Sequence, residues 1–259
     1  MVISSRKNPA VMTFRELDRE RRAREEQHLF CIEGVRLCEE AVRAGLTINS
    51  AFVTETAAKK YSGVYELICS VCEPYIITDD LGSYISDTKS PQGMFMTAQM
   101  LDKSAEMCTI ENGRFILLDG LQDTGNIGTI LRTCDALGIG GVILSPECAD
   151  VYSPKVVRGA MGSLFRLPFA VTPLPPFIER FRESGGKVYA SVLDRNAVSI
   201  DSTRFPAKCA VVIGNEGNGV SAEVIDAADE KIYIPIQNAE SLNAAIAAAI
   251  FCREMSRNV

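Results

Sequence analysis

The stretch "FILLDGLQDTGNIGTILRTCDALGIGGVILS", residues 115–145, decides the fold. It begins with the apolar run "FILLD" (115–119), continues with the helix-like segment "GTILRTCDALG" (128–138) and returns to the apolar run "GGVILS" (140–145). Both runs are apolar throughout, as is typical of strands that are buried on both faces of a parallel sheet. The stretch therefore predicts a strand, a helix and a second parallel strand, in a sheet covered by helices on both faces.

The same alternation of apolar runs and helix-period segments continues in both directions along the chain. The other expected strands are "FCIEG" (30–34), "SAFVT" (50–54), "PYIIT" (74–78), "KVYASVL" (187–193), "CAVVIG" (209–214) and "KIYIPI" (231–236). Helix-like segments separate them, and a last helix is expected from Glu240. This order indicates α/β architecture throughout the chain.

A polar stretch without a pattern, "QMLDKSAEMCTIENGR" (99–114), interrupts the alternation. Such a break is typical of a linker between domains. We therefore expect a first α/β domain over residues 1–100, a linker over 101–112 and a second α/β domain with a mostly parallel sheet over 113–259.

Three polar corners follow expected strands of the second domain: "DGLQDTGNIG" (119–128), "GNEGNG" (214–219) and "PIQNAESLN" (235–243). In open parallel sheets, ligands bind outside the carboxyl ends of the strands. Glycine lets a ligand approach the backbone closely, so the corners favour a ligand held by main-chain groups. Three corners of this kind indicate one shared pocket.

Each corner also has a purely structural interpretation. Gly125 and Gly128 fit turns, Thr124 or Asn126 fits the cap of the first helix, Gly138 fits its stop, and Ser241 and Asn243 fit the cap of the last helix. Arg132 fits a surface residue that pairs with Asp135, three positions further along a helix.

The charge of the chain limits the partners that it can have. The net charge is −6, which argues against indiscriminate nucleic-acid binding. However, residues 1–24 carry seven Lys or Arg residues against three acidic ones, so this segment fits either phosphate contact or an ordinary charged helix face.

The sequence points to a cytoplasmic protein with reduced thiols. No apolar stretch approaches the roughly 20 residues that a membrane helix needs, and the first residues lack the apolar core of a signal peptide. The nine cysteines are scattered, and the single CxxC, Cys69 and Cys72, falls two ligands short of a zinc site. The only histidine, His28, lies in a charged stretch and fits a solvated helix end.

The common nucleotide-binding motifs are absent. There is no GxxxxGK[ST], and no GxGxxG follows the first strand of the second domain. By contrast, "DGLQDTGNIGTILRTCDALG" (119–138), "VVIGNEGNGVS" (211–221) and "IPIQNAESLNAAIAAAI" (234–250) resemble, in order, the three motifs of the SpoU (TrmH-type) RNA ribose 2′-O-methyltransferases. The first domain is similar to the substrate-binding domain of that family through "ISSRKNPAV", "FCIEGVRLCEEAV" and "SDTKSPQGMF".

The resemblance implies a function and a fold. This family transfers a methyl group from S-adenosylmethionine to a ribose 2′-hydroxyl, here of 23S ribosomal RNA rather than transfer RNA. Its catalytic domain is a parallel sheet with a deep trefoil knot, one of the rare exceptions to unknotted connections. Its members are homodimers that associate through the catalytic domain, and no metal is needed.

The resemblance also assigns roles to particular residues. The catalytic set that it implies is Asn126, Arg132, Glu216, Ser241 and Asn243, and the cofactor-binding set is Gly214, Glu216, Gly217, Ile234, Ile236, Leu242 and Asn243. The expected RNA contacts are Arg6, Lys7, Arg19 and Arg22 in the basic N-terminal segment, with Arg158 in the second domain. Two departures from the family pattern concern the pocket: Thr124 stands where Pro is usual, and the third motif is one residue shorter and lacks its Gly.

Three other functions stay open at this stage. A base methyltransferase that shares the knotted fold would use the same cofactor. A dinucleotide-dependent oxidoreductase is disfavoured by the missing fingerprint. A non-enzymatic RNA-binding or assembly factor would bind RNA without methyl transfer, which the complete catalytic set argues against.

Overall fold

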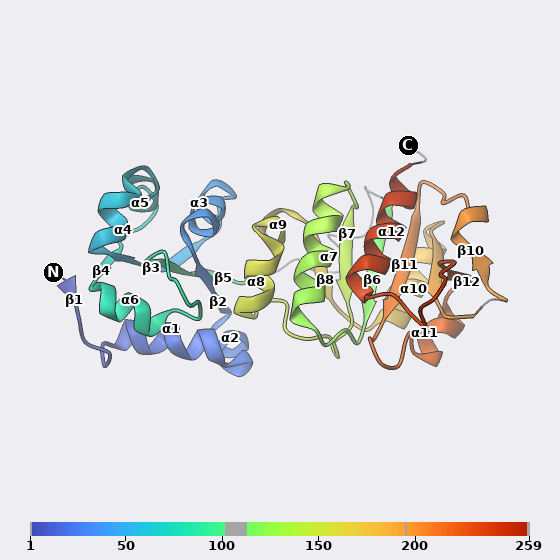
Figure 1. Ribbon diagram of the computed structural model, residues 1–259, viewed down its shortest axis with the longest axis horizontal. Coiled ribbons are helices and arrows are strands. Elements are labelled where there is room, and N and C mark those ends of the chain that lie inside the picture. The colour runs from blue at the N-terminus through green and yellow to red at the C-terminus, as the bar shows by residue number, and fades with distance from the viewer. Residues whose placement is uncertain (1, 102–112, 195, 258–259) are drawn as a thin grey trace. The chain divides into compact units, whose positions relative to one another are not determined.

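The computed structural model of the chain describes residues 2–101, 113–194 and 196–257. These form two compact units, one of Met1–Leu101 with Asp150–Phe165 and one of Asp102–Ala149 with Arg166–Val259 (Figure 1). The expected linker lies outside the described residues, apart from Leu101.

The first unit is built on a five-stranded sheet in the order β1-β4-β3-β5-β2. The strands are β1 (Val2–Ile3), β4 (Tyr75–Ile77), β3 (Ile48–Thr54), β5 (Met94–Gln99) and β2 (Leu29–Glu33). Strands β1, β4 and β3 run parallel, whereas β5 is antiparallel to both of its neighbours. We did not expect β5, because it directly adjoins the polar stretch that was interpreted as a linker.

Six helices of the N-terminal part belong to this unit: α1 (Pro9–Arg19), α2 (Arg21–Gln27), α3 (Val35–Arg43), α4 (Glu55–Lys60), α5 (Ser62–Cys69) and α6 (Asp79–Ile85). Phe14 of α1 packs edge-on against Phe52 and Phe95 of the sheet, with ring centroids 5.6 and 5.8 Å away. His28 is exposed at the end of α2, in the left-handed conformation of a helix cap, which confirms its interpretation as a helix end.

Segment Asp150–Phe165 clusters with the first unit, although the sequence placed it in the second domain. It carries α8 (Pro154–Ala160) and most of α9 (Ser163–Arg166), and α8 packs against β2. The reason is a shared apolar core, in which Phe30 of β2 lies 5.0 Å from the ring of Tyr152 and 6.3 Å from that of Phe165.

The second unit holds a seven-stranded sheet in which all neighbours are parallel, which confirms the expected fold class. In sheet order the strands are β10 (Val198–Ser199), β12 (Glu230–Tyr233), β9 (Lys187–Ser191), β11 (Cys209–Gly214), β6 (Arg114–Asp119), β7 (Gly141–Leu144) and β8 (Phe169–Val171). The expected knot concerns the path of the chain and stays a prediction.

Helices cover both faces of this sheet (Figure 1). On one face α7 (Thr124–Ala136) packs against α12 (Ala244–Ser256); α12 contacts β11 and β6, and α7 contacts β7. On the other, α10 (Leu174–Glu183) and α11 (Ala222–Ala227) pack together over a cluster of phenylalanine, valine and leucine side chains. The remaining helical element is a single 3₁₀ turn, Ile200–Ser202.

Two expected helix starts are wrong. Helix α7 is capped by Asp123, whose carboxylate accepts hydrogen bonds from the N–H groups of Gly125 and Asn126, rather than by Thr124 or Asn126. Helix α12 begins at Ala244 and not at Glu240, because Asn243 caps it. The cap by Asn243 and the stop of α7 at Gly138, which has a φ of +68°, are as expected.

Candidate active site

The first two polar corners meet at the carboxyl ends of the adjacent strands β6 and β11. These strands are in register to their last residues, where Asp119 lies opposite Gly214. The Asp119 carboxylate accepts a hydrogen bond from the N–H of Ser221 at 2.7 Å, and the Asn215 amide donates to the carbonyl of Gly120 at 2.7 Å. Side chains therefore join the two corners, as the topology of a parallel sheet predicted. Sequence reasoning missed Asp119 and Asn215, whose only signal was a polar residue at a strand end.

One chain of hydrogen bonds joins all three corners. The amide nitrogen of Asn126 donates to Glu216 Oε1 at 2.9 Å, and the amide nitrogen of Asn243 donates to the amide oxygen of Asn126 at 2.9 Å. The oxygen of Asn243 accepts from the N–H groups of Ala245 and Ile246 at the start of α12. Three of the five predicted catalytic residues are thus brought together, from α7, from the loop after β11 and from the start of α12.

The direction of this chain is fixed at both ends. A carboxylate can only accept hydrogen bonds, and the first N–H groups of a helix can only donate them. Asn126 must therefore turn its NH₂ group toward Glu216 and its oxygen toward Asn243. These hydrogen bonds hold Asn126 in one orientation.

Glu216 is ionised under ordinary conditions. Besides Asn126, its carboxylate accepts hydrogen bonds from the main-chain N–H groups of Gln122 at 3.3 Å and Asp123 at 3.2 Å. Partial burial by itself raises the pKa of Glu216, but the hydrogen bonds to its charged form outweigh this effect and bring the pKa below its ordinary value. The corner after β11 therefore presents a fixed negative charge beside the start of α7.

The second corner is a closed loop, which explains its glycines. Asn215 and Gly219 exchange two main-chain hydrogen bonds of 3.0 and 2.9 Å, and the Asn215 side chain accepts from the N–H groups of Gly217 and Asn218. A Cβ atom at Gly214 would lie 2.1 Å from the carbonyl carbon of Gly219 and 2.2 Å from the nitrogen of Val220. Gly214 is therefore required by the loop itself, whereas Gly217 is exposed.

The third corner leaves its backbone free. Within the described part of the chain, the main-chain groups of residues 234–242 form no hydrogen bonds. Three side chains of this segment are half-buried: Ile234, Ile236 and Leu242. Unpaired N–H and C=O groups beside apolar side chains fit an adenosyl group, which needs main-chain partners for its base and apolar contacts for its ring.

The two departures from the family pattern do not disrupt the corners. Thr124 occupies the first position of α7, where Pro is favoured but other residues are accepted, and Asp123 supplies the cap. Asn238 has a φ of +61°, in the left-handed region that glycine and asparagine adopt most readily. In the shortened third corner Asn238 therefore takes the conformation for which a glycine would be suited.

Two predicted catalytic residues stand apart from the hydrogen-bonded chain. Arg132 is exposed on α7, and its side chain forms no hydrogen bond or ion pair with any described residue. Arg132 is a surface residue, as its structural interpretation expected, but its expected partner Asp135 is paired with Arg166 at 3.0 Å instead. Ser241 is exposed, and its hydroxyl also has no partner among the described residues.

The predicted RNA contacts differ in how free they are. Arg6, Lys7, Arg19 and Arg22 are all exposed, and Arg22 pairs with Glu26 at 2.6 Å. The guanidinium of Arg6 lies over the ring of a tyrosine, 4.3 Å from its centroid.

Two other arginines have partners inside the first unit. Arg158 pairs with Asp87 at 2.6 Å and with Glu33 at 3.7 Å. Arg24, one of the seven basic residues counted near the N-terminus, is buried and pairs with Asp150 at 2.6 Å. Arg24 therefore holds segment Asp150–Phe165 in place and is not part of a basic surface.

Neither a metal centre nor a membrane span is found in the described part of the chain. No group of three His, Cys, Asp or Glu side chains among these residues could hold a metal ion. No helix that the structure describes is long and apolar enough to cross a membrane.

The fold and the site together define a class: an α/β protein in which main-chain groups and amide side chains gather in three corners at the carboxyl edge of a parallel sheet. A family model described as "SpoU rRNA Methylase family" matches residues 113–253, and one described as "MRM3-like substrate binding domain" matches residues 8–96. The chain belongs to the SpoU rRNA methylase family.

Relatives cover nearly the whole chain. A 23S rRNA (guanosine(2553)-2′-O)-methyltransferase, RlmP, from Bacillus subtilis is 32% identical over 96% of this chain and 96% of its own. The crystal structure of an AdoMet-bound rRNA methyltransferase from Sinorhizobium meliloti superposes with a TM-score of 0.89 at 28% identity, covering 100% of this chain and 98% of the other. The SpoU methyltransferase AviRb from Streptomyces viridochromogenes, in complex with AdoMet, gives 0.86 at 27% identity, covering 97% and 98%.

Proposed function

We propose that the protein methylates the 2′-hydroxyl of a ribose in 23S ribosomal RNA, with S-adenosylmethionine as methyl donor. The observation that carries the proposal is the hydrogen-bonded chain Glu216–Asn126–Asn243 beside the unpaired backbone of residues 234–242. The family and the methyltransferases among its relatives support the same activity.

The third corner fits the cofactor. Its free main-chain groups would hold the adenine, and Ile234, Ile236 and Leu242 would surround the adenosyl group. The closed loop of residues 214–219 would form the other wall, with Gly217 facing solvent. When bound, S-adenosylmethionine supplies an electrophilic methyl group whose carbon–sulfur bond breaks as the ribose oxygen attacks, with the bonding electrons passing to sulfur.

The side chains of this site would position the ribose and stabilise the charge that develops on its oxygen, rather than act as a strong base. Asn126, held in one orientation, would fix the edge of the pocket where the ribose enters, which is a contribution from positioning. Arg132 has a charged side chain without a partner, and a guanidinium stays protonated in proteins. We therefore assign to Arg132 the stabilisation of the developing negative charge on the ribose oxygen, while an RNA phosphate or solvent takes the proton.

We also infer a homodimer that associates through the second unit. Ile246 is 53% exposed in the first turn of α12, whose first nine residues are all apolar, and Arg132 lies on α7, which packs against α12. An interface over these two helices would bury Ile246 and would place Arg132 near a second copy. Equilibrium sedimentation of the wild type against Ile246→Glu tests this, since only an interface at α12 makes the variant monomeric.

The RNA would be positioned by the first unit. Arg6, Lys7 and Arg19 are exposed and form no ion pair with a described residue. Reversing these three and Arg22 to Glu should weaken RNA binding and flatten its salt dependence, because phosphate contacts release counterions. Cofactor affinity should not change. Arg158 could contribute only if its ion pairs with Asp87 and Glu33 opened.

One experiment tests the proposed activity directly. Purified protein, S-adenosylmethionine carrying a labelled methyl group and unmodified ribosomal RNA are incubated, and the RNA is digested to nucleosides and analysed by mass spectrometry. We expect the label on ribose, in 23S rather than 16S or transfer RNA. Label on a base would establish a base methyltransferase instead, and RNA binding without transfer would establish a binding factor. Mapping 2′-O-methyl groups in cells with and without the protein identifies the nucleotide.

A further inference from the structure

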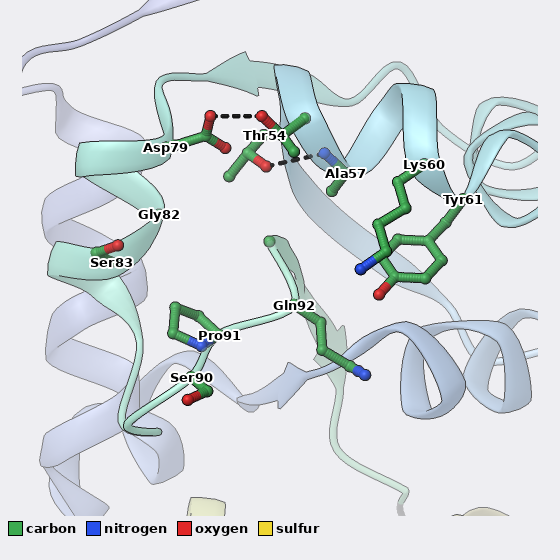
Figure 2. A pocket seen from close by; sticks show the side chains of 12 residues that line it. Thr54, Ala57, Lys60, Tyr61, Asp79, Gly82, Ser83, Ser90, Pro91 and Gln92 are labelled. Carbon is green, nitrogen blue, oxygen red and sulfur yellow. Dashed lines mark hydrogen bonds between the residues drawn. The ribbon is translucent and has the colours of Figure 1, made fainter.

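We propose that a pocket in the first unit binds one unpaired base of the RNA substrate. This inference rests on the proposed function and adds a second recognition site to it. The pocket has a volume of about 300 Å³ and lies between α4, α6 and the loop before β5 (Figure 2). That loop belongs to "SDTKSPQGMF" (86–95), a motif that the catalytic site does not use.

The pocket is formed before any ligand arrives. Its floor is Thr54, which is only 4% exposed and whose hydroxyl accepts a hydrogen bond from the N–H of Ala57 at 3.1 Å. Thr54 fits tightly between two glycines, because a Cβ atom at Gly82 would lie 2.6 Å from its Cγ2 and one at Gly93 would lie 2.4 Å from its Oγ1. A preformed wall of this kind reduces the entropy that a ligand loses on binding.

The polar groups around the pocket are both donors and acceptors. In Figure 2, Asp79 and Ser83 of α6 lie on one side, Lys60 and Tyr61 lie on the other, and Gln92 lies between them below. The Gln92 side chain already accepts a hydrogen bond from a main-chain N–H at 3.0 Å, so its NH₂ group is left to donate. Tyr61 is half-buried and is the one aromatic residue that lines the pocket.

The carboxylate of Asp79 decides between a base and a phosphate. Hydrogen bonds from Thr56, at 2.6 Å in the closest case, and from Thr54 lower the pKa of Asp79 below its ordinary value, so the group is ionised at neutral pH. A negative charge in the wall repels a phosphate group, but it accepts a hydrogen bond from a base N–H. Each of the four bases carries an N–H donor and an acceptor on its Watson–Crick edge, which is accessible only when the base is unpaired.

An aromatic ring, a carboxylate and an ammonium group around a small pocket therefore match one base of a single-stranded segment. The Lys60 ammonium lies 5.1 Å from the centre of the Tyr61 ring, where it can donate to a base carbonyl or ring nitrogen. Recognition of single-stranded RNA combines base contacts of this kind with aromatic side chains. The pocket would select an extruded nucleotide, while the basic segment holds the backbone.

The test uses the full-length protein and a short single-stranded RNA from the methylated region, with binding measured by fluorescence anisotropy at several salt concentrations. Asp79→Asn should weaken binding about five- to tenfold, because a hydrogen bond to a charged carboxylate becomes one to a neutral amide oxygen. Its matched control is Asp80→Asn, which removes an adjacent exposed carboxylate of the same helix that does not line the pocket. Tyr61→Leu should weaken binding similarly, and Tyr65→Leu, outside the pocket, should not.

The sign of the Asp79→Asn effect separates the two kinds of site. At a phosphate site, removing a negative charge tightens binding, as we expect for Asp80→Asn through general electrostatics. At a base site, it weakens binding and leaves the salt dependence unchanged, because no counterion is released. Tighter binding by Asp79→Asn, or equal affinities of Tyr61→Leu and Tyr65→Leu, would overturn the proposal.

Two further arms complete the test. Replacing one nucleotide at a time by an abasic residue should reveal a single position at which the base matters and Asp79→Asn has no further effect. The four nucleoside 5′-monophosphates should compete poorly; competition at lower concentration than the RNA would make this a free-nucleotide site and refute the RNA assignment. If the wild type transfers methyl groups and the pocket variants bind RNA as tightly as the wild type, the pocket proposal fails and the proposed function stands. If the pocket variants bind RNA more weakly but the wild type transfers no methyl group, the proposed function fails and the pocket proposal stands.

Discussion

Asn126→Asp is the most informative change in the candidate active site. Aspartate has nearly the same shape as asparagine, but it replaces the NH₂ group that faces Glu216 with a carboxylate oxygen 2.9 Å from another. The hydrogen bond from Asn243 to residue 126 survives, because a carboxylate also accepts. The change therefore reverses one link of the chain and leaves the other intact.

The expected cost follows from Coulomb's law. Two unit charges 2.9 Å apart repel by about 1.4 kcal/mol at the dielectric constant of water and by about 6 kcal/mol at an effective value of 20. Glu216 is exposed, so the lower end applies, and the start of α7 offsets up to about 1 kcal/mol of the repulsion by favouring a negative charge. Losing the hydrogen bond adds about 1 kcal/mol. We expect Asn126→Asp to lower the free energy of unfolding by about 2 kcal/mol at pH 8.

The loss should depend on pH in a definite direction. In the folded variant, the two carboxylates share a site, so the pKa of one of them is raised above its value in the unfolded chain. A carboxyl group with a raised pKa binds more protons when the protein is folded, so stability is retained below the unfolded pKa near 4 and falls as pH rises. Urea unfolding at pH 4 and pH 8 should show a much smaller deficit at pH 4.

A double-mutant cycle with Glu216→Gln isolates the interaction. In the double variant the new glutamine can donate to the new aspartate, so this pair is restored with its roles exchanged, although the hydrogen bond from the Asp123 N–H to the same atom is lost. We expect a coupling energy of about 1.5 kcal/mol or more at pH 8, with partial recovery of cofactor affinity measured by calorimetry. Additive effects of the two changes, or a deficit that does not vary between pH 4 and pH 8, would refute this arrangement of hydrogen bonds.

Three further predictions concern other residues. Arg132→Ala should lower the single-turnover rate of methyl transfer by on the order of 10²-fold with little change in cofactor affinity, and Arg132→Lys should recover part of the rate if charge dominates. Near-wild-type transfer by the alanine variant would show that Arg132 has no role in the reaction. Burial and neighbouring carboxylates raise the pKa of Asp18 to about 6, so its charge destabilises the protein as pH rises through that value. After allowance for solvent screening, Asp18→Asn should add about 1 kcal/mol to the free energy of unfolding at pH 7.5 and almost nothing at pH 4. Equal effects at the two pH values would contradict this prediction. Asn238→Gly should keep full cofactor affinity, whereas Asn238→Val, strained by about 1–2 kcal/mol at a φ of +61°, should lose affinity several-fold; equal affinities would show that the loop conformation does not matter.

The location of the site was predictable from the sequence. Strands such as "FILLD" and "CAVVIG" are apolar throughout, and parallel strands end at a common edge, so polar residues that follow them must come together. The short elements were not predictable. Strands β8 and β10 have three and two residues, too few for any periodic pattern. The longer helix α10 was missed as well, because the prolines in its first turn are typical of a loop.

Segment Asp150–Phe165 shows a different limit. Its association with the first unit depends on Arg24, which sequence counting assigned to a basic surface, and on Phe30, which is more than a hundred positions away along the chain. A buried ion pair and an aromatic cluster between distant segments leave no trace in local patterns. Charge counted along a sequence therefore overstates the charge that reaches the surface.

The candidate active site also combines residues that the sequence identifies with contacts that only the fold shows. Asn126, Glu216 and Asn243 could be selected from their motifs, but the direction of their hydrogen bonds depends on main-chain groups whose positions only the fold shows: the N–H groups at the start of α12 and those before α7. Because those groups can only donate and a carboxylate can only accept, the two asparagines have one arrangement that satisfies every partner. A substitution that changes a donor into an acceptor should therefore perturb this site through charge, whereas one that removes the side chain should act through lost hydrogen bonds. Asn126→Ala removes the hydrogen bonds to Glu216 and from Asn243, so its loss of stability should be nearly the same at pH 4 and pH 8. The loss caused by Asn126→Asp should instead grow as the pH rises.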